Sequence, residues 1–447
     1  MKKVIMKSLA VLLAVMTVFG LAACSTEEVQ SGYIEETDKI PEVGGKIKFS
    51  YEGNTEIKQN AANAFINAFL KKYPGTEIER DFSYTTGAAA NRIAAGDIGD
   101  VFYFAESSVY NYAVTHKALM DLKYYIEAFR IDTDDIYSGI FAAGMIDGNV
   151  YYVARDFNQM IMLYNKDRVK SAGVDQYVQD GWNWDTFLNV CTQVTDDDYY
   201  GADVNIWYDP VFVPLLSAET GRGTWYDTAS GKINLTKDGT TAAIEDLIDA
   251  YSAGTINLGL GDRSAFSEKK PVFTQCVYLQ AESNGLQYDN EFIDWEMIHL
   301  PLANNAANTA FGCGSSGVGV YNRTKNPNAA AAFALFFYTP EGQTEFKGQT
   351  GGSVPVLAAL ENADFWHHAS DTENGWNTKN WKANVYKADD YAVIGQLQCI
   401  LPPDVANVFE ENWKIAMESV LNGTMQLSDA MKHIEELANQ KWASLKK

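Results

Sequence analysis

The sequence predicts an α/β protein built from two lobes, and three observations support this prediction. The chain behind its leader is about 400 residues long, which exceeds the size at which one hydrophobic core stops growing. A strand pattern, a helix pattern and a second strand pattern follow one another between residues 47 and 82. No segment repeats at a period of about 20 to 50 residues, so solenoids and propellers are excluded.

The first 24 residues have the layout of a secretory signal that ends in a cysteine. Residues 2–7 hold three lysines, residues 9–19 are apolar, and small residues precede Cys24. The apolar run is shorter than the roughly 20 residues of an uninterrupted membrane span. Leu21-Ala22-Ala23-Cys24 resembles the bacterial lipobox, in which the cysteine receives a diacylglyceryl group and becomes the new N-terminus. We therefore expect a signal peptide at residues 1–23 and a lipoprotein whose anchor, with palmitate, is carried by Cys24; an ordinary cleaved signal with a chance cysteine is the alternative.

The segment that follows Cys24 is predicted to be a flexible stalk. Residues 25–45 carry six acidic side chains, end in Gly44 and Gly45, and contain few apolar residues. Such a segment cannot bury enough apolar surface to offset the entropy that ordering would remove. Residues 24–45 would therefore tether the folded part to the membrane without crossing it.

Charge and cysteine usage narrow the classes of partner. The formal net charge is −23, and it becomes −26 in the mature chain because the signal holds three lysines and no acidic residue. This balance opposes nucleic acid and anionic lipid as partners.

Four further cysteines, Cys191, Cys276, Cys313 and Cys399, are far apart and lack CxxC spacing. Three pairings are open to them, but a chain of this length does not need disulfides, and buried free thiols are favoured.

The first elements behind the stalk predict a parallel sheet. Residues 47–51 alternate apolar and polar side chains as a strand does, and apolar residues from Ile57 to Phe69 recur at helical spacing until Tyr73-Pro74-Gly75. A second strand is expected at residues 77–82. A strand, helix, strand order predicts parallel pairing with a right-handed crossover, and such sheets bind ligands beyond the carboxyl ends of their strands. Those ends are the loops at residues 51–55, 84–87 and 104–108.

A series of short motifs carries a resemblance to a known family. In chain order they are Tyr73 to Ile78, Gly96 to Val101, Leu119 to Leu122, Asp147 to Tyr151, Tyr164-Asn165-Lys166 with Gly173, Trp184 to Phe187, Trp295 before Leu300-Pro301, Ala329 to Phe337 with Glu341 to Phe346, and Pro355. Together they resemble the extracellular solute-binding proteins, family 1, of sugar ABC transporters. The resemblance covers essentially the whole mature chain. One departure is Gly99, where the family commonly has proline.

The resemblance implies a periplasmic-binding-protein-like fold of type II. Two α/β lobes would be joined by three hinge crossings, with the ligand in the cleft between the lobes. On this chain the crossings fall near residues 154–158, 309–313 and 353–355. Lobe 1 would comprise residues 46–153 and 314–352, and lobe 2 residues 154–313 and 353–447. The second lobe would end in amphipathic helices such as residues 405–421, which Asn422-Gly423 would stop.

The resemblance also nominates ligand-binding residues, and the aromatic content agrees with it. The sequence has 25 tyrosines and 10 tryptophans, many of them beside amides and acids. A sugar offers apolar C–H faces and a rim of hydroxyl groups, which suit aromatic plates and bidentate polar groups. The nominated residues are Glu52, Asn54, Tyr84, Thr85, Phe104, Glu106, Ser107, Ser108, Asn158, Trp207, Tyr208, Tyr278, Gly314, Ser315, Glu410 and Trp413.

Three other motifs favour structural roles over chemistry. Residues 312–317 match GxGxxG, but a strand pattern follows them where a dinucleotide site needs a helix. Residues 196–201 begin like a calcium loop, yet Tyr200 and Trp207 occupy positions that need acids, so a solvated turn is favoured. His367 and His368 are adjacent and point apart, without a third ligand at helical spacing. We expect no metal and no cofactor.

We therefore expect a monomeric, lipid-anchored subunit that captures a substrate for an ABC importer and hands it to a membrane permease. The leading ligand is a carbohydrate, in the first place an oligosaccharide. No nucleophile, base and orienting group can be nominated from spacing, so no enzyme is expected. Two alternatives stay open: an exported lipoprotein that hydrolyses sugars with a pair among its 58 acidic residues, and a sensor that reports ligand occupancy to a membrane kinase.

Overall fold

The computed structural model describes residues 40–350 and 353–445. The predicted signal, the lipobox cysteine Cys24 and most of the stalk lie outside the described residues, so their predictions stay predictions. The described residues form one compact unit by their contacts. Within the described ranges, no helix has both the length and the apolar character that a membrane span requires.

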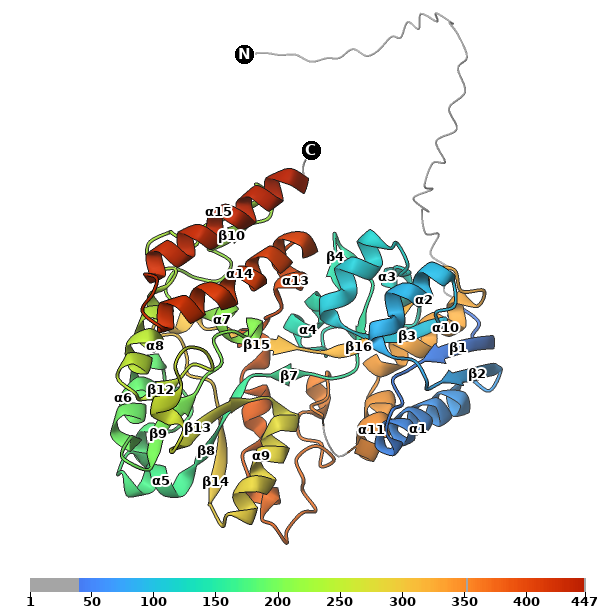
Figure 1. Ribbon diagram of the computed structural model, residues 1–447. Helices are drawn as coiled ribbons and strands as arrows, with labels where there is room; N and C mark the ends of the chain where they lie inside the picture. The colour runs from blue at the N-terminus through green and yellow to red at the C-terminus, as the bar shows by residue number, and fades with distance from the viewer. Residues whose placement is uncertain (1–39, 351–352, 446–447) are drawn as a thin grey trace, which may run out of the picture. The chain divides into compact units, whose positions relative to one another are not determined.

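The first of two five-stranded sheets, sheet A, has the order β2-β1-β3-β16-β6 (Figure 1). β1 pairs in parallel with β2 and β3, whereas β16 is antiparallel to β3 and β6. The parallel half comes from one end of the chain and β16 from a segment more than 200 residues later. The strands are β1 (Gly45–Ser50), β2 (Thr76–Asp81), β3 (Val101–Ala105), β6 (Val153–Ala154) and β16 (Ser316–Val320).

The predicted strand, helix, strand unit is confirmed, and its causes are local. Helix α1 (Glu56–Lys72) starts where the Thr55 hydroxyl accepts a hydrogen bond from the Lys58 N–H, and Lys71 and Lys72 lie in its last turn. The helix ends before Pro74, which cannot continue it. The face of α1 that carries Phe65 and Phe69 is fully buried against α11 (Pro340–Thr350) and its neighbours.

The second sheet, sheet B, repeats this design with the order β12-β9-β13-β8-β14. β9 pairs in parallel with β12 and β13, and β8 is antiparallel to β13 and β14. Residues of β8 alternate between two hydrophobic clusters, because successive side chains of a strand point to opposite faces. The strands are β8 (Ile161–Asn165), β9 (Tyr199–Asp203), β12 (Ile256–Asn257), β13 (Lys270–Cys276) and β14 (Trp295–His299).

A third, small sheet contains the segments through which the chain passes between sheets A and B. Strand β7 (Asn158–Gln159) lies in sequence between β6 of sheet A and β8 of sheet B, and β15 (Phe311–Gly314) leads from β14 back to β16. β15 is antiparallel to β7 and parallel to β17 (Ala392–Ile394). The backbone of Phe157 also pairs with Val354, so a third segment joins this region.

Two hairpins complete the strands. β4 (Met145–Ile146) and β5 (Asn149–Val150) are joined by Asp147 and Gly148, whose φ angles of +51° and +79° suit a type I′ turn. β10 (Tyr226–Asp227) pairs with β11 (Lys232–Ile233).

The remaining helices cover the two sheets. The predicted helix at residues 405–421 is confirmed as α14 (Pro403–Leu421), which ends before Gly423 at φ +69° and lies beside α15 (Leu427–Leu445) (Figure 1). The others are α2 (Ala89–Ala95), α3 (Lys123–Ala128), α4 (Ser138–Ala143), α5 (Lys166–Ser171), α6 (Trp184–Val194), α7 (Asp209–Leu215), α8 (Ala242–Ser252), α9 (Tyr278–Asn290), α10 (Pro327–Leu335), α12 (Ala388–Tyr391) and α13 (Leu397–Ile400).

Gly312 shows why the GxGxxG stretch needs glycine for packing. It lies in β15, and a Cβ atom added there would overlap the backbone carbonyl of Pro210 in α7. The overlap is with backbone, which cannot move away as a flexible side chain could. The glycine therefore lets α7 approach the small sheet closely.

We predict that Gly312→Ala lowers the free energy of unfolding by more than about 2 kcal/mol, because the new methyl group forces backbone apart. Gly87→Ala is the control, since no atom lies within 4 Å of a Cβ added at Gly87, and it should change stability by at most about 0.5 kcal/mol. Urea unfolding of the two variants measures the difference. Equal stabilities would contradict the close approach of α7 and β15.

Candidate functional site

A cavity of about 300 Å³ lies where the ends of sheets A and B meet the small sheet. Its size is at the lower end of the range of small-molecule sites. The lining mixes hydroxyl, amide and carboxyl groups with apolar side chains and one tyrosine ring. The lining residues are Ala105, Glu106, Ser107, Asn158, Met160, Tyr208, Pro210, Val277, Leu279, Gly314, Ser315, Ser316 and Gln396.

The cavity lies at the carboxyl ends of strands from both sheets. Residues 105–107 come directly at the end of β3 in sheet A. In sheet B, Tyr208 and Pro210 follow β9, and Val277 and Leu279 follow β13. An open α/β sheet presents its ligands beyond these ends, because the loops there are free to vary above a rigid scaffold. The cavity thus occupies the place that the strand, helix, strand order predicts.

The chain first passes from sheet A to sheet B at residues 155–160, between β6 and β8, and this segment is called the first passage. It contains an ion pair between Arg155 and Asp156. The Arg155 guanidinium lies 3.1 Å from the Asp156 carboxylate and donates hydrogen bonds to the Ser316 hydroxyl and, at 3.0 Å, to the Tyr51 hydroxyl. Its carbon centre lies 5.1 Å from the ring centre of Tyr103, within the range of a cation–π contact. Asp156 in turn accepts hydrogen bonds from both the N–H and the hydroxyl of Ser316, each at 2.8 Å. These contacts join β6, β16 and β1.

Two buried polar side chains of α11 connect the first and third passages. Gln343 Nε2 donates to the carbonyl of Arg155 at 3.2 Å, and Gln343 Oε1 accepts from the Val356 N–H at 3.3 Å. Lys347, which is fully buried, donates to the carbonyl of Val354 at 3.4 Å. Burial lowers the pKa of Lys347 to about 7, while Asp156 raises it and Arg155 lowers it further. Helix α11 is therefore hydrogen bonded to two of the segments that meet at the small sheet.

Asp209 positions one wall of the cavity. This carboxyl group is 4% exposed and accepts a hydrogen bond from the Leu397 N–H at 3.1 Å. Burial raises the pKa of Asp209 to about 7, the Leu397 N–H lowers it, and Glu410 raises it. The contact places Gln396, which precedes Leu397, at the cavity, which Tyr208 also lines.

The model of a protein family, described as "Bacterial extracellular solute-binding protein", matches residues 64–374 of this chain. This is most of the chain. The chain belongs to the bacterial extracellular solute-binding protein family. The family places the protein outside the cytoplasm, and its members bind substrates.

Solved structures show the same two-lobe fold. The sugar-binding protein MalE of Xanthomonas citri is 14% identical, with a TM-score of 0.71, and the match covers 90% of this chain and 98% of that one. A substrate-binding protein of Listeria monocytogenes in complex with cycloalternan is 17% identical, with a TM-score of 0.66 and coverage of 89% and 99%. UgpB of Mycobacterium tuberculosis in complex with glycerophosphocholine is 17% identical, with a TM-score of 0.67 and coverage of 90% and 100%.

In this solute-binding protein, six of the sixteen nominated residues line the cavity. They are Glu106, Ser107, Asn158, Tyr208, Gly314 and Ser315. Glu52 forms an ion pair with Lys58 at 3.2 Å, Ser108 is half-buried, and Asn54 and Thr85 are exposed. None of these four lines the cavity. Trp207 is 41% exposed beside Tyr208, with its ring 5.8 Å from Lys414 Nζ, and does not line the cavity either.

Four nominated aromatic residues are corrected to core positions. Phe104 is 1% exposed and packs on Phe102, Tyr112 and Tyr152, and Tyr84 donates its hydroxyl to the Tyr103 carbonyl at 2.7 Å. Tyr278 and Trp413 are fully buried and donate to the carbonyls of Trp366 and Ile206. Glu410, one turn before Trp413, is exposed and accepts from Gln398. Tyr84 and Tyr278 come after strands, Phe104 lies within β3 and Trp413 within α14, and all four side chains are buried in the core.

Sequence reasoning missed seven lining residues. Val277 and Leu279 flank the nominated Tyr278 at the start of α9. Had the sequence analysis placed the Tyr278 side chain in the core, it would have assigned these two neighbours to the cavity. Ser316 follows the nominated Ser315. Gln396 had no local signal, because the contact of Asp209 with the next residue places it. Ala105, Met160 and Pro210 complete the set.

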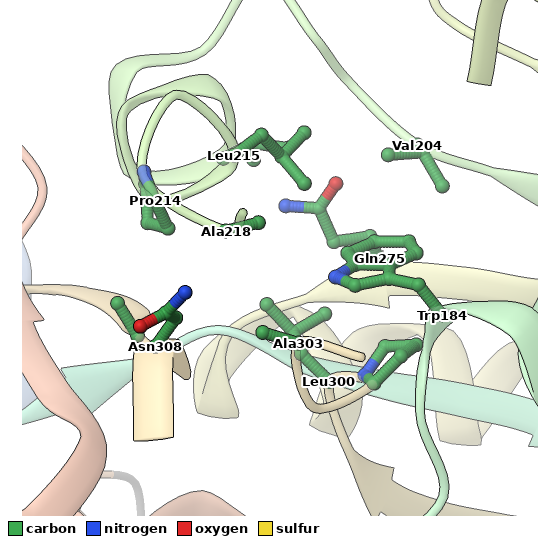
Figure 2. A pocket seen from close by; sticks show the side chains of 12 residues that line it. Trp184, Val204, Pro214, Leu215, Ala218, Gln275, Leu300, Ala303 and Asn308 are labelled. Carbon is green, nitrogen blue, oxygen red and sulfur yellow. The ribbon is translucent and has the colours of Figure 1, made fainter. Parts of the chain in front are cut away.

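A second hollow, within the structure around sheet B, does not suit a sugar (Figure 2). Its free space is about 20 Å³, which is room for one water molecule. Trp184, Leu215 and Leu300 are among its apolar walls, and the Gln275 amide lies among them. Gln275 Oε1 accepts from the Asn205 N–H, whereas Nε2 has no hydrogen-bond partner among the described residues. A single bound water would satisfy this donor.

The other motifs have structural contacts. Asp196 Oδ1 accepts from the N–H groups of Asp198 and Tyr199, which makes the solvated turn that was predicted. His368 Nε2 lies 2.8 Å from a Glu282 oxygen and 3.0 Å from the Tyr278 hydroxyl. In the described part of the chain the four cysteines are free thiols. Cys399 is half-buried, and the other three are buried.

We predict that Lys347→Met removes a pH dependence of stability. The pKa of Lys347 is lowered from 10.5 to about 7 in the folded protein, so between these values the unfolded chain binds more protons, and stability rises with pH. The change in stability that urea unfolding measures from about pH 6.5 to about pH 9.5 should therefore be more positive in the wild type than in Lys347→Met, since other buried groups such as Glu106 contribute equally to both proteins. Lys71→Met, at an exposed position of α1, is the control. Parallel pH profiles for wild type and Lys347→Met would contradict the buried position of this ammonium group.

Proposed function

We propose that this solute-binding protein is the substrate-capturing subunit of an ABC importer, that its ligand is a carbohydrate, in the first place an oligosaccharide, and that it does not act as an enzyme. The observation that carries the proposal is the composition of the cavity at the strand ends. Tyr208 offers an aromatic face, Leu279 and Val277 offer apolar surface, and Glu106, Asn158 and Gln396 offer hydrogen-bonding groups. These groups match the two kinds of surface that a sugar has.

The charge of the lining supports a sugar over a phosphodiester. The cavity lining contains no lysine, arginine or histidine. Phosphate recognition relies on such cations, which form charge-assisted hydrogen bonds with its oxygens. One structural neighbour is in complex with glycerophosphocholine and another with cycloalternan, so the shared fold admits either class. The uncharged donors and the carboxyl group of this lining favour a carbohydrate over a phosphodiester as the ligand.

The mechanism that we propose is closure of the two lobes by bending at the three passages. Lobe 1 would comprise residues 46–153 and 314–352, with sheet A, and lobe 2 residues 154–313 and 353–447, with sheet B. A ligand that contacts both lobes only when they are closed shifts the population toward the closed state. The permease would recognise the closed form, and the binding protein would act as a monomer.

A thermal-shift screen of sugars, amino acids, peptides and polyamines tests the ligand class. A ligand at about 100 times its Kd adds about 2.7 kcal/mol of stability, which raises the Tm measurably. We expect oligosaccharides to give the largest shifts and to be recovered unchanged. In Tyr208→Ala the affinity should fall by about 1 to 3 kcal/mol, with little change in the Tm of the unliganded protein, because Tyr208 is 37% exposed.

Tyr177→Ala is the matched control, since Tyr177 is 48% exposed and lies outside the cavity. It should bind as the wild type does. Stabilisation by amino acids or polyamines instead of sugars would overturn the carbohydrate proposal. An unchanged affinity of Tyr208→Ala would remove Tyr208 from the site.

We further propose that the protein is anchored by lipid at Cys24. The lipobox-like Leu21 to Cys24 and the acidic stalk support this proposal. Cys24→Ser should release the protein from membranes or leave it unprocessed, because the thiol is the point of acylation. Membrane fractionation and the size of the product measure both results. A serine variant of mature size that still sediments with membranes would show that Cys24 is not the anchor.

A further inference from the structure

Two buried carboxyl groups, one of which lines the cavity, are bound by consecutive backbone amides. The Ser315 N–H donates to Glu106 Oε2 at 2.8 Å, and the Ser316 N–H donates to Asp156 Oδ1 at 2.8 Å. Glu106 follows β3, whereas Asp156 lies in the first passage between the sheets. Both groups are nearly inaccessible, with 4% and 3% exposure. Their environments otherwise differ.

Asp156 has the partners of an ionised carboxylate. The Ser316 hydroxyl donates to its Oδ2 at 2.8 Å, and Asn158 Nδ2 donates to its Oδ1 at 3.2 Å. The Arg155 guanidinium lies 3.1 Å away. With the Ser316 N–H this makes three hydrogen-bond donors and a counter-ion, which is what a buried negative charge requires.

Glu106 has far less to stabilise a charge. The donors near its carboxyl group are the Ser315 N–H, 2.8 Å from Oε2, the Ser315 hydroxyl and its own N–H, and none of them is charged. The titratable groups that face it are those of Asp156, Tyr152, Tyr208, Cys313 and Cys399, none of them a cation. A buried carboxyl group without a counter-ion is more stable as the neutral acid. Consistent with this, burial raises the pKa of Glu106 to about 8, the Ser315 N–H lowers it, and Asp156 raises it.

The position of the proton follows from the hydrogen bond that the Ser315 N–H donates. Oε2 accepts from Ser315, so the proton of the neutral acid belongs on Oε1. Oε1 faces Gly314, and a Cβ added at that position would lie 2.9 Å from it. Glu106 and Gly314 both line the cavity. The missing side chain at Gly314 thus leaves Oε1 beside the space that a ligand would fill.

We propose that Glu106 is a neutral acid whose O–H group is presented to the cavity as a hydrogen-bond donor, with Asp156 as the ionised member of the pair. The ligand atom opposite Oε1 is then an acceptor, such as a hydroxyl, ring or glycosidic oxygen, and not an ammonium group. The ligand part of this inference rests on the proposed function, whereas the protonation of Glu106 does not. Pairs of carboxyl groups in unequal environments commonly divide their roles in this way.

The inference is tested without any ligand, by following the side-chain carboxyl carbons in ¹³C NMR from about pH 4 to about pH 10. The signal absent from Glu106→Gln identifies Glu106, and it should be that of a neutral acid at pH 7 and change near pH 8. Glu345→Gln, at an exposed position of α11, is the control and should leave the Glu106 signal in place. A Glu106 signal that is already that of a carboxylate at pH 6 would overturn the proposal.

Stability gives a second readout. The folded protein binds more protons than the unfolded chain between pH 4.5 and about 8, since the pKa of Glu106 is raised, so the wild type should lose stability relative to Glu106→Gln as pH rises across this range. An unchanged difference would also overturn the proposal. Neither result depends on sugar binding: an ionised Glu106 leaves the proposed function standing, and a cleft that binds no sugar leaves the protonation of Glu106 intact.

Discussion

The hydrogen bonds from the consecutive amides of Ser315 and Ser316 to two buried carboxyl groups connect the parts of the structure on which the cavity depends. Glu106 directly follows β3, Asp156 lies between β6 and β7, and the two serines lie where β15 passes into β16. Each of these segments contributes to the cavity lining or to the frame behind it. A shift in the strand register at Ser316 would break both contacts at once, because neighbouring amides would change places.

The same region shows how an acidic protein places a buried cation. With 58 acidic residues against 35 basic ones, the chain has a large excess of negative charge, yet it uses Arg155 at the passage between sheets. The guanidinium is held by Asp156 and by the faces of Tyr103 and Phe346, at 5.1 and 5.2 Å. An arginine suits this place, because its planar group donates in several directions and stacks on rings. Movement of the sheets must keep or exchange these contacts.

The fold could be predicted from sequence to a useful depth, since its signals are local. The spacing of Phe65 and Phe69, the turn at Pro74, and the alternation in β1 are each sufficient to define an element. The position of the cavity followed from strand order, because parallel strands place their carboxyl ends at one edge. Two nominated residues that line the cavity come after strands: Glu106 directly follows β3, and Tyr208 lies five residues beyond the end of β9.

The orientation of individual aromatic side chains could not be predicted in the same way. Phe104 and Tyr278 lie one or two residues from residues that line the cavity, and a shift of one position in a strand or at a helix start turns a side chain from the cavity to the core. Trp413 is placed by its stacking on Phe212, which is 201 residues away, and Gln396 by a contact with Asp209. Such distant contacts leave no local pattern.

The central claim is that the protein closes its two lobes on a carbohydrate held between their strand ends. Small-angle X-ray scattering of the protein with and without a saturating concentration of a stabilising oligosaccharide tests this most directly. The account predicts a smaller radius of gyration in the presence of the sugar, because closure brings the lobes together. A radius of gyration that stays the same while the sugar is bound would contradict capture by closure.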